Sequence, residues 1–277
     1  MADESKSTGD PPGDQQRSAE RATDARSADF ALICSQAAEV RPLLKHLDRQ
    51  RKYVDNGFVF RGGFLDQTLR IVVVEAGFDF AGHRKATQIV INEHHPNWVM
   101  STGFSLGLSD TVKTGDVCLA NQISDLHGHS LQLDLPLEGG KRVHCGKHVV
   151  MDEPSLLPAA QQQLSDSSGA DAADLASLAV AQVCQQKTGD QMAASFLAIR
   201  SGLSRRDADV TELLLEVAFC RPKEVTKPPV MQWLAKLKPD PVRREALKRL
   251  EEASVNSNRY LLQVIRKLGE KLSGSRW

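Results

Sequence analysis

The sequence predicts an α/β fold built on a central mixed, mostly parallel sheet, and three observations lead to that prediction. Apolar runs at 71–74, 98–100 and 117–120 are unbroken, which is typical of strands covered on both faces. Segments with helical spacing of apolar residues separate the strands, and this alternation favours helices packed on a sheet. Glycines follow the first two runs, at Gly77 and within 103–107, where backbone often comes close to a ligand. We therefore expect an active site beside these glycines.

The individual elements follow from the same patterns, taken in chain order. Short apolar segments predict strands at 30–34, 58–60, 69–74, 98–100, 117–123, 143–151, near 170–173, and at 196–199. Apolar residues at helical spacing predict helices at 37–47, 81–93, 156–165, 174–186, 210–218, 231–237 and 241–272. Pro96 ends the second of these helices, because the residue before a proline avoids the α region. Alternating leucines within 124–142 indicate a small β excursion.

Domain organisation follows from length and composition. The 277 residues are enough for a sizeable core. Residues 1–28 lack any periodic apolar signal, so we expect a disordered tail there. Residues 29–204 form the predicted domain core, and 205–277 form a helical C-terminal region that packs on the same domain.

Charge and hydropathy exclude several classes of partner. Thirty-five basic and 35 acidic side chains give a formal net charge of zero, so nothing favours nucleic acid or an anionic membrane as the partner. No apolar stretch approaches the roughly 20 residues of a membrane-spanning helix, and the N-terminus lacks the apolar segment of a signal peptide. The five cysteines are scattered, which favours reduced thiols. We expect a cytoplasmic protein.

The sequence also contains side chains of the types that bind metal ions. Imidazole and thiol side chains occur in two groups about 15 residues apart, at His127, His129, His144, Cys145 and His148. Alternate residues of a strand face opposite sides, and no second pair of ligands completes a tetrahedral set. We therefore expect no metal.

Three motifs occur in a fixed order and carry a resemblance to a known family. They are A-G-F-D-F-A-G-H-R-K-A-T at 76–87, S-T-G-F-S-L-G-L at 101–108 and V-K-T-G-D-V at 112–117. Neither the dinucleotide fingerprint nor the P-loop motif is present. The combination resembles the nucleoside phosphorylase superfamily, especially its methylthioadenosine/S-adenosylhomocysteine nucleosidase and hopanoid-associated phosphorylase branches. Similar segments at 38–40, 169–181 and 196–204 extend the resemblance over about 28–204.

The resemblance implies a fold and a chemistry. The fold would be a three-layer α/β/α sandwich with a C-terminal helical extension that caps it. Members cleave the N-glycosidic bond of a purine nucleoside with water or with inorganic phosphate as co-substrate, and they need no other cofactor. They form homo-oligomers, so we expect one here. In the nucleosidases one carboxylate orients water, one holds the ribose diol and one is the general acid.

The catalytic positions of the family are only partly kept. Glu39 matches the water-orienting glutamate. The ribose-binding glutamate falls on Ala176, although the acidic residue two positions earlier is kept as Asp174. The general acid falls on Ser204, whose hydroxyl is far too weak an acid, so Asp207 or Asp209 would replace it only if the loop shifts by about three residues or more.

Other positions matched to the family concern ligand binding. The family serine in the T-G-S loop falls on Phe104, and the arginine that phosphorylases often place just before that loop falls on Ser101. The expected ligand-binding residues are Gly77, Gly103, Phe104, Ser105, Asp152, Leu175 and Ser204.

Two functional hypotheses follow from these matches and gaps. The first is a purine-nucleoside phosphorylase or nucleosidase that relies on Glu39 with help from Asp174, Asp207 or Ser105. The second is a catalytically degenerate member that acts as a nucleoside-binding or regulatory module. Asp174 also has a purely structural explanation as a helix N-cap, and Glu39 one as a solvated helix residue.

Overall fold

The computed structural model describes residues 28–151, 158–188, 191–219 and 241–274. Most of the expected tail, the expected helix at 231–237 and Asp152 lie outside these ranges. Ala28, which the sequence placed in the tail, is buried, and its N–H donates to the carbonyl oxygen of His94.

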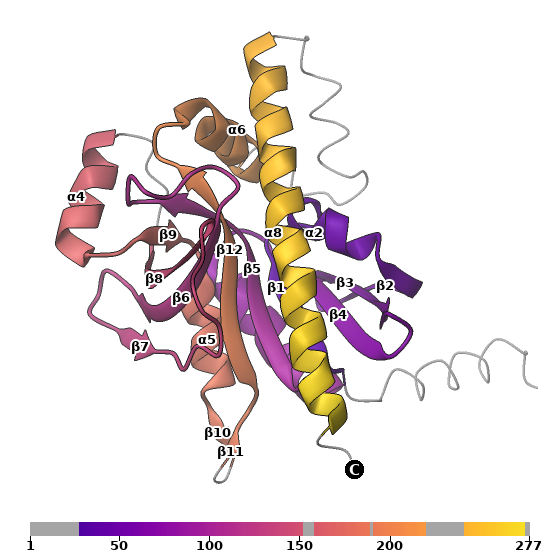
Figure 1. Cartoon of the computed structure of the whole chain (residues 1–277). Helices are drawn as coiled ribbons and strands as arrows, with labels where there is room; N and C mark the ends of the chain where they lie inside the picture. The colour runs from indigo at the N-terminus through magenta and orange to yellow at the C-terminus, as the bar shows by residue number, and fades with distance from the viewer. Residues whose placement is uncertain (1–27, 152–157, 189–190, 220–240, 275–277) are drawn as a thin grey trace, which may run out of the picture.

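The strands and helices alternate along most of the described chain (Figure 1). The strands are β1 (Phe30–Cys34), β2 (Leu47–Asp55), β3 (Phe58–Leu65), β4 (Leu69–Glu75), β5 (Trp98–Gly107), β6 (Val117–Ser124), β7 (Ser130–Gln132), β8 (Val143–Val150), β9 (Ala172–Asp174), β10 (Lys187–Thr188), β11 (Gln191–Met192) and β12 (Ser195–Ser204). The helices are α2 (Ala37–Leu44), α3 (Phe80–His94), α4 (Pro158–Ser168), α5 (Ser177–Cys184), α6 (Ala208–Phe219) and α8 (Pro241–Gly274).

The main sheet has an open arm and a closed ring. The arm runs β1–β4–β3–β2. The ring forms because β12 pairs with both β5 and β6, while β8 and β9 connect β6 back to β5. Within the described sheet, parallel and antiparallel pairings are equally frequent. The sheet is therefore mixed, as expected, and its antiparallel pairings include those of β2, β3 and β4, which short turns join as neighbours.

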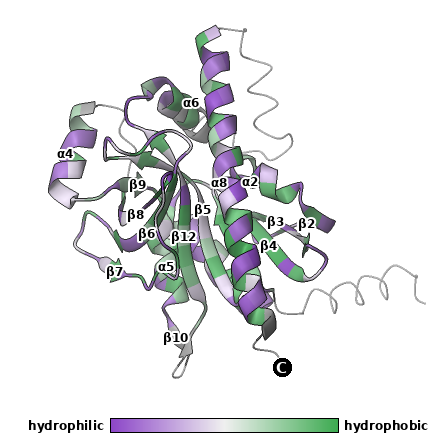
Figure 2. Cartoon of the chain, in the orientation of Figure 1, coloured by the Kyte–Doolittle hydropathy of each residue, from purple (hydrophilic) through white to green (hydrophobic). Residues whose placement is uncertain are grey.

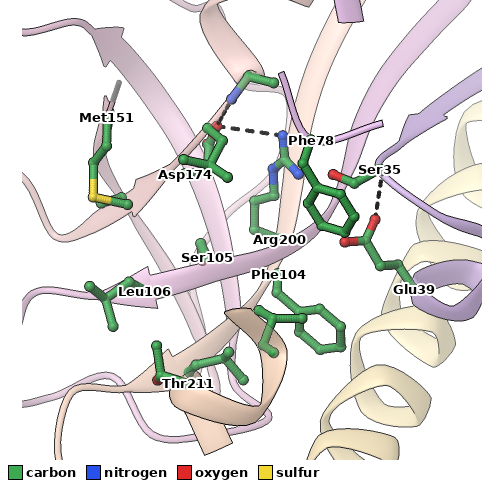
Figure 3. A pocket seen from close by; sticks show the side chains of 15 residues that line it. Ser35, Glu39, Phe78, Phe104, Ser105, Leu106, Met151, Asp174, Arg200 and Thr211 are labelled. Carbon is green, nitrogen blue, oxygen red and sulfur yellow. Dashed lines mark hydrogen bonds and ion pairs between the residues drawn. The ribbon is translucent and has the colours of Figure 1, made fainter. Parts of the chain in front are cut away.

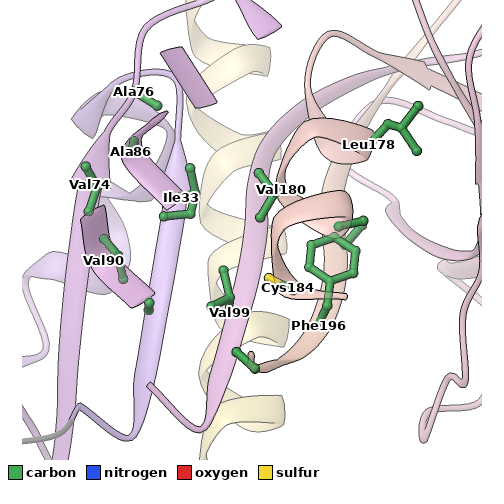
Figure 4. Close-up of a cluster of buried hydrophobic side chains, with 14 of the residues drawn as sticks. Ile33, Val74, Ala76, Ala86, Val90, Val99, Leu178, Val180, Cys184 and Phe196 are labelled. Carbon is green, nitrogen blue, oxygen red and sulfur yellow. The ribbon is translucent and has the colours of Figure 1, made fainter. Parts of the chain in front are cut away.

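Helices lie on both faces of the open arm. Alternate residues of β1 enter two different cores, since successive side chains of a strand point to opposite faces. Ile33 packs with α3 and α5 (Figure 4), whereas Leu32 packs with α2 and α8. The long helix α8 contributes Leu261 and Ile265 to the second core, so α8 packs on this face of the sheet together with α2. Figure 2 shows hydrophobic and hydrophilic residues interleaved along α8, as expected of a helix with one buried side.

Three element boundaries differ from the sequence prediction for identifiable reasons. The expected helix at 37–47 ends at Leu44, because the chain from Leu47 pairs with β3 as a mostly exposed edge strand that has little apolar signal. The strand expected to stop at Met100 continues through the glycines to Gly107, since it pairs with β12 along its whole length. The helix expected from residue 174 begins at Ser177, because Asp174 ends β9.

Candidate functional site

A pocket opens where several parallel strands end at their carboxyl sides, as ligand sites commonly do in open α/β sheets. It encloses about 630 Å³ of empty space, counted out to its solvent-open mouth. The lining residues are Ser35, Glu39, Phe78, Phe104, Ser105, Leu106, Met151, Ala173, Asp174, Leu175, Ala176, Arg200, Leu203, Thr211 and Leu214. Figure 3 shows Leu106 and Met151 at one end and Glu39 with Ser35 at the other, with aromatic rings and Arg200 between them.

Glu39 lies in the first turn of α2 and is 5% exposed. Its Oε2 accepts a hydrogen bond from the backbone N–H of Ser35 at 2.8 Å and one from Gln36 at 3.4 Å. Helix α8 fixes this turn from the other side, because Ser254 Oγ and Asn258 Nδ2 both donate to the carbonyl oxygen of Glu39, at 3.0 and 2.7 Å. The carboxylate of Glu39 is therefore positioned by two helices and by the end of β1.

Gly103 has a steric reason to be glycine. Its φ of 129° lies in a region that side-chain-bearing residues rarely adopt. A Cβ at this position would lie 2.8 Å from Glu39 Oε2 and 3.0 Å from Arg200 Nη1. The carboxylate and the guanidinium thus approach the backbone of β5 where a side chain would otherwise stand.

Arg200 extends from β12 into a buried polar network and is 3% exposed. Its Nη1 donates to the carbonyl oxygen of Thr102 at 2.7 Å, and its Nη2 donates to Ser101 Oγ at 2.6 Å. Its Nη2 also donates to Ser177 Oγ at 2.9 Å, and lies 3.6 Å from Asp174 Oδ1. The guanidinium is therefore committed to the protein's own oxygens.

Asp174 is the counter-ion of Arg200 and also binds the start of α5. Its Oδ1 accepts from the backbone N–H groups of Ala176 and Ser177, at 2.8 and 2.7 Å, and its Oδ2 accepts from Ser177 Oγ at 2.6 Å. Burial alone raises the pKa of Asp174, but Arg200, His148 and the Ser177 hydroxyl outweigh it and hold that pKa well below its ordinary value. Asp174 is a buried carboxylate whose lowered pKa keeps it ionised at neutral pH, and it holds the start of α5 in place.

His83 lies on α3 behind the same wall. Its Nε2 is 2.9 Å from the carbonyl oxygen of Gly77 and 3.5 Å from Ser35 Oγ. Burial, and then the positive charge of Arg200, lower the pKa of His83 to about 4. The imidazole is therefore neutral at physiological pH.

Several expected ligand-binding residues do line the pocket. Phe104, Ser105 and Leu175 are among them, as are the expected catalytic residues Glu39 and Asp174. Gly103 is not among the lining residues, but it lies against Glu39 and Arg200, which are.

Other expected residues are placed elsewhere. Gly77 is not among the lining residues, although its neighbour Phe78 is. The Oγ of Ser204 accepts from the Arg206 N–H, and Asp207 accepts from Thr114 Oγ1 and from Arg249 Nη1; neither Ser204 nor Asp207 lines the pocket. Asp152 lies outside the described residues.

Sequence reasoning assigned no role to Arg200, Phe78 or His83. A signal existed for Arg200, because a charged residue inside the apolar run F-L-A-I-R must find partners once buried. Nothing comparable distinguished His83 or Phe78 from ordinary helix and loop residues.

Three of the histidines that are potential metal ligands lie next to different carboxylates. His129 is paired with Asp125, His144 with Asp116, and His148 lies near Asp174. Among the described residues, no three His, Cys, Asp or Glu side chains are arranged to hold a metal ion. Within the same part of the chain, none of the helices combines the length and apolarity needed to cross a bilayer.

Comparison with solved structures identifies the fold. A 5′-methylthioadenosine/S-adenosylhomocysteine nucleosidase from Neisseria meningitidis, in complex with methylthio-immucillin-A, matches 88% of this chain and 99% of its own with a TM-score of 0.63 at 18% identity. The corresponding nucleosidase from Colwellia psychrerythraea 34H, in complex with adenine, matches 87% and 96% with a TM-score of 0.61 at 18% identity. Futalosine hydrolase of Helicobacter pylori strain 26695 matches 89% and 99% with a TM-score of 0.60 at 16% identity.

These neighbours are members of the nucleoside phosphorylase superfamily, so the resemblance drawn from the sequence motifs is confirmed at the level of the fold. No family model matches the sequence, and no curated protein matches it. The comparison therefore establishes the fold. At these low sequence identities it assigns no role to any residue of this chain.

Proposed function

We propose that the pocket binds a purine ring, as a free base or as part of a nucleoside, and that it does not cleave the N-glycosidic bond at the rate of a nucleosidase. Two rings, Phe78 and Phe104, and an apolar wall that includes Leu106 and Met151 suit a flat heteroaromatic ligand. The carboxylate of Glu39 offers an acceptor for a purine N–H group. Solved structures of the same fold hold adenine or methylthio-immucillin-A, which supports this ligand class.

The absence of rapid turnover rests on the lack of a general acid, because Ser204 stands at the family's acid position and Asp174, a lining carboxylate that could replace it, is bound by the protein itself. This carboxylate is ionised, accepts three hydrogen bonds from the start of α5 and is paired with Arg200, so it has no proton to donate to a departing base. Ser204, which stands at the position of the family's acid, is outside the pocket lining. Loss of a general acid typically costs about 10²–10⁴-fold in rate.

The described lining of the pocket also offers little to bind phosphate as a co-substrate. Arg200 is the only cationic side chain among the described lining residues, and it donates to Thr102, Ser101 and Ser177. A bound phosphate would have to compete with these buried partners. The proposed function therefore includes neither hydrolysis nor phosphorolysis at an enzyme's usual rate.

The test combines a binding and a turnover measurement on the same protein. Free base released from adenosine, 5′-methylthioadenosine and S-adenosylhomocysteine is measured chromatographically, with and without phosphate. We expect turnover below roughly 10⁻² s⁻¹, about a thousandfold under a typical enzyme, together with a rise in melting temperature on adding adenine. Base release at the rate of an ordinary enzyme would refute the loss of catalysis. A melting temperature unchanged by adenine and by all three nucleosides would refute purine binding.

A further inference from the structure

Ser35 directly follows β1, and its backbone is held from two directions. Its N–H donates to Glu39 Oε2 at 2.8 Å, and its carbonyl oxygen accepts from the N–H of Gly77 at 3.1 Å. The residue is 8% exposed and lines the pocket. Ser35 therefore presents a hydroxyl group to the pocket from a backbone that is fixed in place.

His83 determines how this hydroxyl group can be used. Its Nε2 lies 2.9 Å from the carbonyl oxygen of Gly77 and 3.5 Å from Ser35 Oγ. A carbonyl oxygen can only accept, so we assign the proton of the neutral imidazole to Nε2. The other tautomer would set a lone pair against the Gly77 oxygen and a proton on Nδ1, which has no hydrogen-bond partner among the described residues. Ser35 Oγ can therefore only accept from His83, and the Ser35 hydroxyl proton points elsewhere.

We propose that Ser35 binds the ligand by donating its hydroxyl proton to an acceptor atom of the purine compound, and that His83 is a positioning residue that directs this proton into the pocket. The inference rests on the proposed purine-binding function and adds a donor to the acceptor that Glu39 provides. Figure 3 shows the Ser35 and Glu39 side chains at the same end of the pocket. Purine ring nitrogens, and the ribose oxygens of a nucleoside, are acceptors of the required kind.

The primary test is a double-mutant cycle between Ser35 and single atoms of the ligand. Calorimetry measures the dissociation constants of two parent compounds, adenine and adenosine, for the wild type and for Ser35→Ala. The 1-, 3- and 7-deaza analogues of adenine and the 2′-, 3′- and 5′-deoxy analogues of adenosine are measured in the same way. We expect Ser35→Ala to bind at least one parent about tenfold more weakly, and to bind one of its analogues as tightly as that parent, because the analogue lacks the atom that accepts from Ser35.

The failures of this test are distinct. Unchanged affinity of Ser35→Ala for both parents would contradict the proposal. So would a loss of affinity that is equal for each parent and all of its analogues, since the substitution would then act through the fold and not through a hydrogen bond to the ligand. If neither adenine nor adenosine binds the wild type, purine binding itself is wrong and this inference falls with it.

The tautomer of His83 is tested in the wild-type protein without ligand. Nitrogen-15 chemical shifts of the ring distinguish the two neutral tautomers of histidine, and the signals of His83 are identified by their loss in His83→Gln. We expect the proton on Nε2 at neutral pH. A proton on Nδ1 would contradict the direction assigned to the Ser35 hydroxyl.

Two substitutions test the positioning role of His83 in ligand binding. His83→Leu has no N–H group, so it should reduce the difference in affinity between the parent and the analogue identified by the cycle. His83→Gln can donate an amide N–H to the Gly77 oxygen and should retain that difference. If His83→Leu retains it as fully as His83→Gln, His83 is not a positioning residue. The tautomer measurement decides the question if His83→Leu fails to fold.

Discussion

The two ends of the pocket each hold a buried carboxylate, and the two carboxylates have different partners. Asp174 is bound by a guanidinium, two backbone N–H groups and a hydroxyl, all of which belong to the protein's own framework. Glu39 is held at the first turn of α2 by backbone N–H groups, with its turn anchored by α8. Both side chains are buried carboxylates, 3% and 5% exposed, so their hydrogen-bond partners are the basis for proposing a structural role for Asp174 and a ligand-binding role for Glu39.

This difference predicts that changes at the Asp174 end alter stability, whereas changes at the Glu39 end alter binding. The following four predictions test that division, starting with the largest expected effect.

Arg200→Met should destabilise the protein by about 3–5 kcal/mol, because it leaves the carboxylate of Asp174 buried without its counter-ion. Chemical denaturation measures the free energy of unfolding. Arg266→Met is the matched control, since Arg266 pairs with Asp66 on the surface and both side chains are nearly half exposed. Equal decreases in the free energy of unfolding of the two variants would show that the Arg200–Asp174 pair has no special role in stability.

Acidification should destabilise the protein through His83 by up to about 3 kcal/mol between pH 6.5 and pH 4. The pKa of His83 is depressed from 6.5 to about 4 in the folded state, so the unfolded chain binds the proton first as the pH falls. His83 therefore costs the folded state no stability above pH 6.5, and the free energy of unfolding falls progressively as the pH is lowered towards 4.

The variant His83→Gln should flatten the dependence of unfolding free energy on pH within that window. His127→Gln, at an exposed position, serves as the control and should leave the slope unchanged. A His83→Gln protein that keeps the wild-type slope would show that this imidazole is not held neutral.

Gly103→Ala should destabilise the protein by at least about 2 kcal/mol and also weaken adenine binding, because the new Cβ would displace Glu39 or Arg200. Gly57→Ala isolates the cost of positive φ, since Gly57 has a φ of 84° and no atom within 4 Å of the added Cβ. That control should cost only about 1–2 kcal/mol and leave binding intact. If the two variants affect adenine binding similarly, Gly103 is not part of the ligand-binding site.

Glu39→Gln has the smallest expected effect on stability and a specific effect on binding. The amide oxygen can still accept from the Ser35 N–H, so the melting temperature should change little. The affinity for adenine should fall roughly tenfold, because a charged acceptor is replaced by a neutral one. Glu251→Gln, on an exposed position of α8, is the matched control. Unchanged adenine affinity would place the ligand away from Glu39.

Much of the fold could be predicted because its signals are local. The apolar runs of β1, β4 and β6 and the amphipathic spacing of α3 can be recognised in single windows of the sequence. Strand β2 could not be predicted, since its charged, exposed residues become a strand only by pairing with β3. The extension of β5 through Gly103 depends likewise on the pairing with β12, which is almost 100 residues away in sequence.

The site could be predicted in position but not in function. The motifs located Glu39, Asp174 and Phe104, which do line one pocket. They could not show that Arg200 neutralises Asp174, because that pairing depends on the ring of strands in which β12 and β9 both pair with β5. Asp207 was expected near the site because it follows Ser204 closely in sequence. It pairs instead with Arg249 of α8 and does not line the pocket.

One nuclear magnetic resonance experiment tests the central claim, binding without cleavage, in a single tube. The protein is incubated with 5′-methylthioadenosine, and saturation transfer to the ligand and the anomeric proton signal are followed over a day. The account predicts saturation transfer to the purine ring protons and an anomeric signal of constant intensity. Steady growth of free adenine signals, or the absence of any transfer to the purine ring, would contradict it.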